Sequence, residues 1–429
     1  MTPRTLRVLP VLLALALILA LFPATLASAA AKPKPTPTPG PTSTPAPTAT
    51  PGPADSGKIM LLGGAIRNND AQIFNAMRAA SPGPKLAVFC SGTTDLVAAQ
   101  KEYASAYENL FTGYGFTPVF IPVAIDNYLD ANADESLVRT VAGCDAVFFN
   151  GGWQERHTRV MFDDDGNPLP LMVAVQAVFD RGGLVSGTSA GDNVMGEYTY
   201  GDGTSYGYLK HNALAVKLIS DVNTADPTDP DNGGYVKGLG FLARYDALAD
   251  SHFSQRGRFA RPLVAMRDTG TTRAFGVDED TAFLLSGTIG TVYGTGGVTV
   301  YDATEADFGK SANEVPGISF TVSNVRVSWL TTGDRYDFTA NAVIPGAGKT
   351  TAPTTGKVYA STNVFGAGEA SKVMTLLGLC TATSATGLSA ETAPQFTVTF
   401  AKGTGTKAYY NAKTRRTAID GQIVSVTYK

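Results

Sequence analysis

Short apolar runs alternate with amphipathic stretches along the chain from residue 58 onward. Candidate strands read KIMLLGG, KLAVFCSG, TPVFIPV, CDAVFFNGG and LVSG, whereas DAQIFNAMRAA and LMVAVQAVFDRGG have the apolar spacing of helices. A strand that is apolar at successive positions is buried on both faces, which favours a parallel sheet covered by helices on either side. The pattern therefore predicts an α/β fold with a doubly wound, mostly parallel sheet.

The pattern changes after about residue 305. Segments such as ISFTVSNVRVSWL, QFTVTF and QIVSVTYK alternate apolar and polar residues, with Gly, Thr and Asn between them. Such alternation is typical of antiparallel strands with one solvated face. We therefore expect a catalytic α/β domain over 57–305 and a β-rich C-terminal module over 306–429. The module contains no titratable cluster that suggests chemistry, so packing or substrate docking is its expected role.

The N-terminus has the pattern of a secretory signal peptide over residues 1–29. Two arginines precede the apolar run LPVLLALALILALF, and the small residues LASAA follow it. A membrane anchor is the alternative, but the run is shorter than the roughly 20 residues that a spanning helix needs. Residues 30–56 are rich in Pro and Thr and predict an extended linker. We expect a secreted protein, extracellular or held at the cell envelope by the linker, with no stable membrane span after cleavage.

Composition excludes several classes of function. The 429 residues carry a net charge of −3, without the basic excess that a nucleic-acid partner requires. Three cysteines (Cys90, Cys144 and Cys380) are too few and too scattered for a disulfide framework and lack metal-ligand spacing. We therefore expect no metal and no cofactor.

Three predicted strands end in glycine-rich or small-residue turns, which read LLGGA, FFNGGWQ and LVSGTSAG. Ligands of open α/β sheets bind beyond the carboxyl ends of the strands, so these turns are expected to border one site. Residues 187–191 match the Gly-x-Ser-x-Gly pattern of a nucleophile on a sharp strand-to-helix turn. Ser189 is thus a candidate nucleophile, and a helix N-cap is the alternative interpretation.

A nucleophilic serine needs a base, and the chain has three histidines: His157, His211 and His252. His252 is favoured because it follows an apolar segment and has charged neighbours. Three arginines lie close behind it, namely Arg256, Arg258 and Arg261. So many cations repel one another unless an anion binds there, which indicates an acidic substrate; a solvated basic face is the alternative.

The segments GGWQ, GTSAG and DSHFSQRGRFAR together resemble the cyanophycinase family of serine exopeptidases. That family shares its fold with dipeptidase E and the class I glutamine amidotransferases, and the resemblance runs from about residue 58 to residue 302. It implies hydrolysis of cyanophycin, a poly-aspartate whose β-carboxyls carry arginine, to β-Asp-Arg dipeptides. It leaves the oligomeric state open, with a homodimer as one alternative.

The resemblance also implies roles for individual residues. Ser189 would be the nucleophile and His252 the general base, oriented by an acid soon after the serine, Asp202 in preference to Glu197. The oxyanion hole would combine the N–H of Ala190 with that of Gly152 or Gly151. The implied substrate-binding residues are Gln154, Asp250, Arg256, Arg258 and Arg261.

The chain departs from the family's pattern at Asp192, Ser251 and Pro262, and the stretch GGAIRNN lacks an acid often found there. These departures predict an altered substrate preference rather than a lost nucleophile or base. Three alternatives remain: a peptidase for other aspartyl or acidic peptides, an inactive extracellular binding protein, and an α/β-hydrolase esterase. The esterase is disfavoured because His252 follows Ser189 too closely for that fold's usual spacing.

Overall fold

The computed structural model describes residues 57–211, 234–309 and 318–429. The predicted signal peptide and the whole of the predicted linker lie outside these residues. Within the described part of the chain, no helix is long and apolar enough to cross a membrane.

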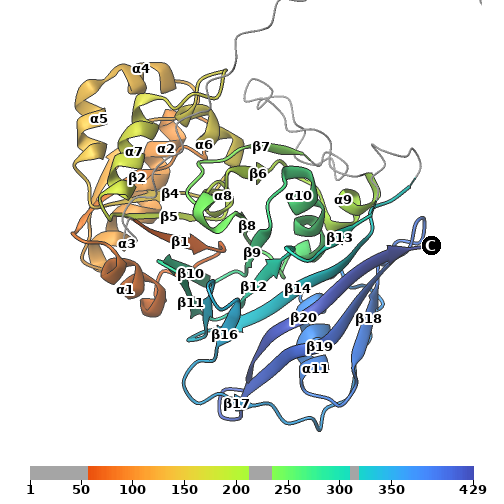
Figure 1. Ribbon diagram of the computed structural model, residues 1–429. Coiled ribbons are helices and arrows are strands. Elements are labelled where there is room, and N and C mark those ends of the chain that lie inside the picture. Colours follow the sequence, from red (N-terminus) through yellow and green to blue (C-terminus); the bar gives the residue numbers. More distant parts are fainter. Residues whose placement is uncertain (1–56, 212–233, 310–317) are drawn as a thin grey trace, which may run out of the picture. The chain divides into compact units, whose positions relative to one another are not determined.

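A nine-stranded sheet forms the centre of the α/β region (Figure 1). Its parallel core consists, in spatial order, of β1 (Lys58–Leu62), β5 (Leu184–Thr188), β4 (Ala146–Phe149), β2 (Lys85–Phe89) and β3 (Thr117–Ile121). Antiparallel strands extend it beyond β1: β10 (Thr281–Ser286), β11 (Ile289–Gly294), β15 (Arg335–Asp337) and β16 (Ala342–Ile344). The predicted doubly wound, mostly parallel fold is confirmed.

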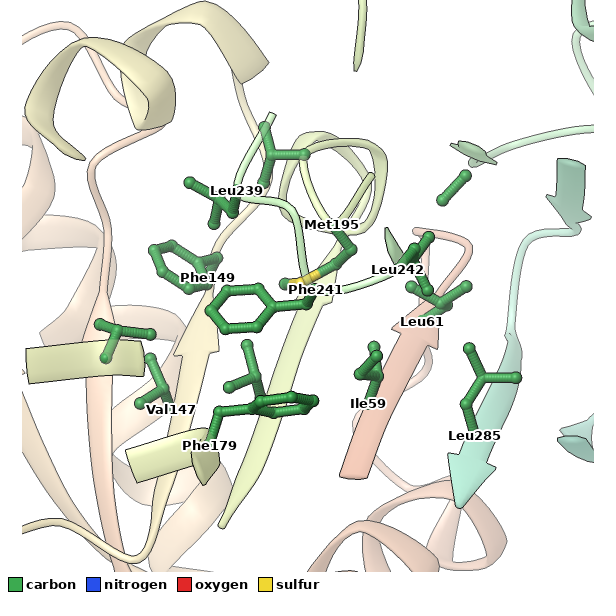
Figure 2. Packing of buried hydrophobic residues seen from close by; sticks show 14 of the residues in the cluster. Ile59, Leu61, Val147, Phe149, Phe179, Met195, Leu239, Phe241, Leu242 and Leu285 are labelled. Carbon is green, nitrogen blue, oxygen red and sulfur yellow. The ribbon is translucent and has the colours of Figure 1, made fainter. Parts of the chain in front are cut away.

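Helices cover both faces of this sheet because successive strand residues point to opposite sides. Met60 and Leu62 pack in one apolar cluster with side chains of the helices between β1 and β3, while Ile59 and Leu61 pack in another with Phe179 and Phe241 (Figure 2). The helices of this region are α1 (Ala71–Ala80), α2 (Leu96–Glu102), α3 (Glu108–Gly113), α4 (Tyr128–Ala133), α5 (Glu135–Ala142), α6 (Gln154–Met161) and α7 (Pro170–Asp180). A π-helical turn, η1 (Tyr103–Tyr107), joins α2 to α3.

A second nine-stranded sheet contains the strand that precedes the candidate base and most of the C-terminal strands. Its main path consists of β8 (Ala247–Asp250), β9 (Arg273–Val277), β12 (Gly297–Asp302), β14 (Val322–Thr331), β20 (Arg416–Tyr428), β19 (Phe396–Asn411) and β17 (Thr350–Thr351). Beside this path, β13 (Asp307–Phe308) pairs with β14, and β18 (Ser384–Leu388) pairs with β19. The helix α11 (Glu369–Gly378) packs with these strands.

The β-rich C-terminal region is present, and it shares its sheets with the α/β region. β14 pairs with β12 from Arg326 to Thr331, and β15 pairs with β11 of the first sheet. The Gly368 N–H also donates to the Ser254 carbonyl (2.8 Å), in the loop that follows the candidate base. The predicted boundary at residue 305 therefore falls inside continuous sheets, and the independence of the C-terminal module stays a prediction.

Shorter elements complete the surroundings of the site. They are α8 (Ala190–Asn193), β6 (Tyr198–Tyr200), α9 (Ser205–His211), β7 (Tyr235–Lys237), η3 (Ala243–Tyr245), η4 (Arg258–Ala260) and α10 (Arg261–Thr269). Pro262 occupies the first turn of α10, where a missing N–H costs no helical hydrogen bond. This departure from the family's pattern is thus accommodated by the helix start.

Candidate active site

Ser189 lies on a strained turn between β5 and α8. Its backbone has φ 56° and ψ −114°, a conformation that is costly for a residue with a side chain and that concentrates at functional sites. The flanking glycines are required by close packing: a Cβ on Gly187 would lie 2.1 Å from the Gly191 carbonyl oxygen, and one on Gly191 would lie 2.3 Å from that of Phe149. The predicted nucleophile turn is therefore formed, and the local packing explains its two glycines.

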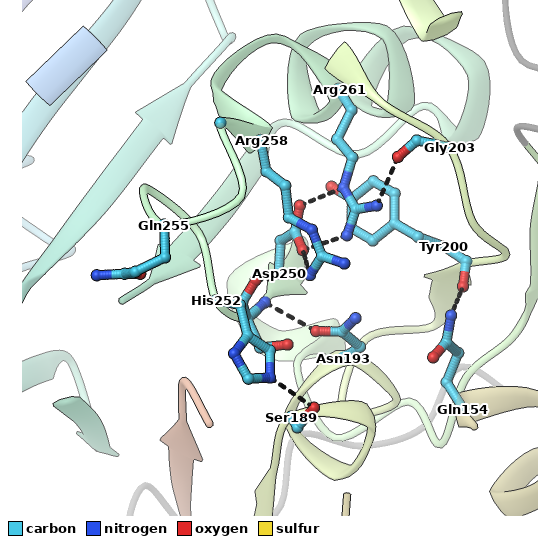
Figure 3. A network of polar contacts seen from close by, with 12 residues as sticks. Gln154, Ser189, Asn193, Tyr200, Gly203, Asp250, His252, Gln255, Arg258 and Arg261 are labelled. Atoms are coloured by element: carbon cyan, nitrogen blue, oxygen red, sulfur yellow. Dashed lines mark hydrogen bonds and ion pairs between the residues drawn. The ribbon is translucent and has the colours of Figure 1, made fainter. Parts of the chain in front are cut away.

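His252 follows β8 and contacts the serine directly. Its Nε2 lies 2.8 Å from the Ser189 Oγ (Figure 3). The His252 backbone also has a positive φ of 47°, and its N–H donates to the Gly63 carbonyl (2.7 Å). A Cβ on Gly64 would lie 2.4 Å from the His252 Nε2, so only glycine leaves room for the ring. The turn after β1 thus holds the imidazole against the serine.

The carboxylate behind the histidine belongs to Glu279, so the prediction of Asp202 or Glu197 is wrong. The Glu279 Oε1 lies 2.8 Å from the His252 Nδ1, and the Glu279 N–H donates to the side chain of Gln255 (3.0 Å). Glu197 instead borders a separate cavity of about 410 Å³ with Lys237.

The error has a physical reason. Asp202 was preferred because of its distance along the chain after Ser189. In the fold, however, the acid comes from the loop after β9, which lies well beyond His252 in the sequence. The sequence signal for this acid was the run VDED, which begins at the last residue of β9.

The electrostatics of His252 suit a proton acceptor. Burial lowers the pKa of His252 below its ordinary value, the hydrogen bond that the Glu279 carboxylate accepts opposes that shift, and Arg256 and Arg258 lower the pKa further. The ring is therefore neutral at neutral pH. A carboxylate at Nδ1 favours the proton on that nitrogen, which leaves the lone pair of Nε2 facing the Ser189 hydroxyl.

The predicted oxyanion hole has partial support from geometry. Ala190 is the first residue of α8, so its N–H has no acceptor within the helix. A Cβ on Gly151 would lie 3.8 Å from the Ser189 Oγ, which places this glycine beside the nucleophile. Gly152 has a φ of 122° and packs against the Gly92 carbonyl. The assignment of the oxyanion hole to the N–H groups of Ala190 and of Gly151 or Gly152 stays a prediction.

Asp250 and Arg261 form an internal ion pair, contrary to the expectation that they contact substrate. Both side chains are 1% exposed, and the Arg261 Nε donates to the Asp250 Oδ2 (2.6 Å). The Arg261 guanidinium also lies 4.5 Å from the centre of the Tyr200 ring and donates to the Gly203 carbonyl. Arg258 donates to the same carboxylate (3.1 Å) and to the Ser251 carbonyl (2.7 Å). The anion that binds Arg258 and Arg261 is therefore the Asp250 carboxylate of the protein itself (Figure 3).

Arg256 and Gln154 have different surroundings. The Arg256 side chain is exposed and has no ion pair with any described residue, while its backbone N–H donates to the His252 carbonyl (3.0 Å). Gln154, at the start of α6, donates its amide to the Tyr200 carbonyl (2.6 Å) and to that of Gly201. Arg256 is thus available to an anion at the site, whereas the Gln154 amide nitrogen holds the end of β6.

Asp192, a departure from the family's pattern, is a buried acid. It is fully buried in α8, and neither of its oxygens has a hydrogen-bond partner within the described residues. Burial and the charge of Asp250 raise its pKa well above the ordinary value, against a smaller effect of Arg258. The neutral carboxylic acid is therefore its favoured form.

The two other histidines lie apart from Ser189. His157 is fully buried, and its Nδ1 lies 2.8 Å from the Ser91 Oγ while its Nε2 contacts the Asn150 carbonyl (3.0 Å). Burial lowers the pKa of His157 to about 4. His211 is exposed at the end of α9. In the described part of the chain, no group of three His, Cys, Asp or Glu side chains could hold a metal ion.

The fold and the site together define a doubly wound α/β protein with serine, histidine and glutamate side chains in series. No protein-family model matches the chain. Curated relatives named cyanophycinase, from Synechococcus elongatus and Thermosynechococcus vestitus, are each 29% identical over 239 residues, which cover 55% of this chain and 66% of each relative. A cyanophycinase of Geminocystis herdmanii is 29% identical over 260 residues, 58% of this chain and 85% of that relative. The resemblance to the cyanophycinase family is confirmed.

Two solved structures are similar to parts of the chain. A peptidase from an acI-B1 Actinobacterium has a TM-score of 0.44 and 14% identity, covering 66% of this chain and 97% of that one. A putative peptidase E protein from Listeria monocytogenes has a TM-score of 0.36 and 11% identity, covering 56% and 98%.

Proposed function

We propose that the chain is a serine peptidase of the cyanophycinase type, with Ser189 as nucleophile, His252 as general base and Glu279 as the acid that orients the base. The observation that carries this proposal is the unbroken series of contacts from Oγ to Nε2 and from Nδ1 to Oε1, each 2.8 Å long. The strained backbone at both Ser189 and His252 supports it, because a structure maintains such strain mainly where function requires it.

The geometry supports an ordinary acyl-transfer sequence. His252 accepts the hydroxyl proton at Nε2 as the Ser189 Oγ attacks the substrate carbonyl carbon, and the oxygen that becomes negative is stabilised by backbone N–H groups at Ala190 and at Gly151 or Gly152. The imidazolium then returns the proton to the leaving amine as the C–N bond breaks. Water, deprotonated by the same histidine, hydrolyses the acyl-serine and restores the hydroxyl.

We propose cyanophycin as the substrate, cleaved from its C-terminal end to β-Asp-Arg dipeptides. The names of the curated relatives support this polymer. Arg256, exposed and unpaired among the described residues, is the group we assign to the terminal carboxylate. A peptidase for other aspartyl or acidic peptides is the second candidate. Because Arg261 and Arg258 are paired with Asp250, only Arg256 of the three arginines remains for substrate, which suffices for the terminal carboxylate of a short aspartyl peptide.

The catalytic contacts also weigh between the remaining alternatives. An inactive binding protein would tolerate a broken series of contacts, but Ser189, His252 and Glu279 are all in place.

We propose in addition that residues 1–29 direct secretion and that residues 30–56 act as an extended linker. N-terminal sequencing of the protein recovered from its source would show the cleavage site.

The experiment is incubation of the mature chain with cyanophycin, and product identification by mass. β-Asp-Arg is expected from the wild type and not from Ser189→Ala. On cyanophycin with an amidated C-terminus we expect the wild type to lose most of its activity, and Arg256→Ala to lose about ten- to a hundredfold on the free acid only. Equal cleavage of both forms would overturn the exopeptidase assignment. Activity on aspartyl dipeptides without activity on the polymer would select the second candidate.

A further inference from the structure

An apolar cavity of about 230 Å³ lies beside the candidate nucleophile. Its walls include the buried side chains of Leu62, Phe74, Phe111 and Phe148, and none of the described residues that line it is charged. Exposed residues at its edge, Ala65 and Asn68, show that the cavity opens to solvent. An apolar cavity that opens to solvent is typical of a ligand-binding site.

The cavity adjoins the catalytic atoms through the backbone. Thr188, which lines it, immediately precedes Ser189, and the Leu62 carbonyl accepts the hydrogen bond from the Ser189 N–H (3.0 Å). Its walls belong to the apolar cluster that contains Met60 and Leu62, whereas Tyr200 beside the Asp250–Arg261 pair belongs to a different cluster. The nucleophile thus has an apolar cavity and an ionic cluster in different parts of its surroundings.

A π-helical turn shapes the outer wall of the cavity. Ala106 and Tyr107 of η1 both line it, and π-helical turns within longer helices are frequently found at functional sites. The Tyr107 ring lies 5.1 Å from that of Phe148, and its hydroxyl donates to the Glu102 carboxylate (3.2 Å). Tyr107 therefore lines the cavity while a ring contact and a hydrogen bond hold its side chain.

The opposite edge of the cavity is tied to the catalytic acid. Ala65 and Ile66 line it directly after Gly64, the residue that packs on the His252 ring. Their neighbour Arg67 donates from both its backbone N–H and its Nε to Asp280, which follows Glu279. The cavity edge and the His252–Glu279 pair are thus held by one loop.

We infer that this cavity is a specificity subsite for an apolar side chain, such as that of Leu, Met or Phe, on the substrate residue next to the scissile bond. A peptide carbonyl placed at the Ser189 Oγ brings a neighbouring side chain within reach of Thr188 and Leu62. An arginine or aspartate side chain would lose its hydration there without gaining a counter-charge. The inference rests on the proposed peptidase reaction with its second candidate substrate, and it narrows that candidate to aspartyl peptides that carry an apolar residue; cyanophycin has no such residue.

The test compares dipeptides that pair Asp with Gly, Leu, Phe or Arg, in both orders and with α and β linkages. We expect the wild type to prefer the Leu or Phe peptide to the Gly and Arg peptides by about ten- to a hundredfold in kcat/KM. Ala106→Leu, which fills the cavity, should remove this preference by lowering kcat/KM for the Leu and Phe peptides to the level of the Gly peptide. Ala104→Leu is the matched control, because Ala104 lies exposed on the same turn and does not line the cavity.

Binding measurements separate this inference from the proposed function. With Ser189→Ala, titration calorimetry should show tighter binding of the Leu peptide than of the Gly peptide, and the added change Ala106→Leu should abolish the difference. Equal binding of the two peptides, or an equal loss on all peptides in Ala106→Leu, would overturn the subsite and leave the peptidase proposal standing. Selective binding of the Leu peptide without any hydrolysis by the wild type would support the subsite and overturn the peptidase proposal.

Discussion

Two serine–histidine pairs occur among the described residues, and they have the same contact distance but different surroundings. In each pair a serine Oγ lies 2.8 Å from a histidine nitrogen: Ser189 with His252, and Ser91 with His157. The second nitrogen of His252 contacts the Glu279 carboxylate, whereas that of His157 contacts the Asn150 carbonyl. Ser91 is fully buried and has no strained backbone, while Ser189 is half-buried on a strained turn.

The comparison teaches that a short hydroxyl–imidazole contact does not by itself make a nucleophile. A hydroxyl must also be reachable, and the imidazolium that forms must be stabilised by an anion. The hydrogen-bond partners of His157 within the described residues are Ser91 and the Asn150 carbonyl, neither of them an anion, and the ring has no contact with solvent. Its pair with Ser91 therefore acts as a polar cross-link between the end of β2 and α6. Only the Ser189 pair meets both requirements.

The largest difference is expected when each serine is truncated. Ser189→Ala should lower kcat by about 10⁶-fold, as in other acyl-serine systems, and leave the fold intact. Ser91→Ala should keep nearly all activity and lower the free energy of unfolding by about 1 kcal/mol, the worth of one hydrogen bond. Hydrolysis rates and urea unfolding of both variants measure this, and substantial activity in Ser189→Ala would contradict the assignment.

The next largest effect is expected at Glu279, because only the Ser189–His252 pair has a carboxylate in contact with its histidine. Glu279→Gln should lower kcat by about 10⁴-fold, because an amide cannot stabilise the imidazolium or hold the required tautomer. Asp202→Asn and Glu197→Gln serve as controls and should stay within a few-fold of wild type, since neither side chain contacts His252. A loss in Asp202→Asn as large as that in Glu279→Gln would restore the acid expected from the sequence.

The pH profile of hydrolysis should follow His252. Its neutral ring accepts the proton, so kcat/KM should fall tenfold per pH unit below its pKa, or about a hundredfold two units below. Because burial and the nearby arginines lower that pKa, the midpoint should lie below the ordinary value of about 6.5. Arg256→Ala should raise the midpoint toward 6.5. If the midpoint of the acid limb does not move in this variant, Arg256 does not contribute to the lowered pKa of His252.

The pH dependence of stability should instead follow His157. Its pKa is about 4 in the folded protein and about 6.5 when unfolded, so the unfolded state binds more protons between these values. Stability contributed by the neutral ring is complete above pH 6.5 and is lost as pH falls toward 4, by about 1.4 kcal/mol per unit. Urea unfolding from pH 7 to 4 measures this, and His157→Gln should flatten the profile. An unchanged slope in that variant would assign the effect to other groups.

The sequence was sufficient to predict the parts of the site that local chain geometry determines. Continuous apolar runs predicted the buried strands, and the glycines around Ser189 predicted a sharp turn, because only glycine fits there. His252 was identified from its position after an apolar run. These features depend on a few consecutive residues and are therefore readable in the chain.

Other features were decided by tertiary structure alone. Glu279 reaches His252 because β9 and β8 pair in one sheet, an arrangement that spacing along the chain does not encode. Likewise, Asp250, Arg258 and Arg261 were expected to bind substrate, and the fold instead buries the carboxylate with the guanidinium groups. Isolated charges in a sequence look unpaired, and only packing shows which counter-charge already neutralises them.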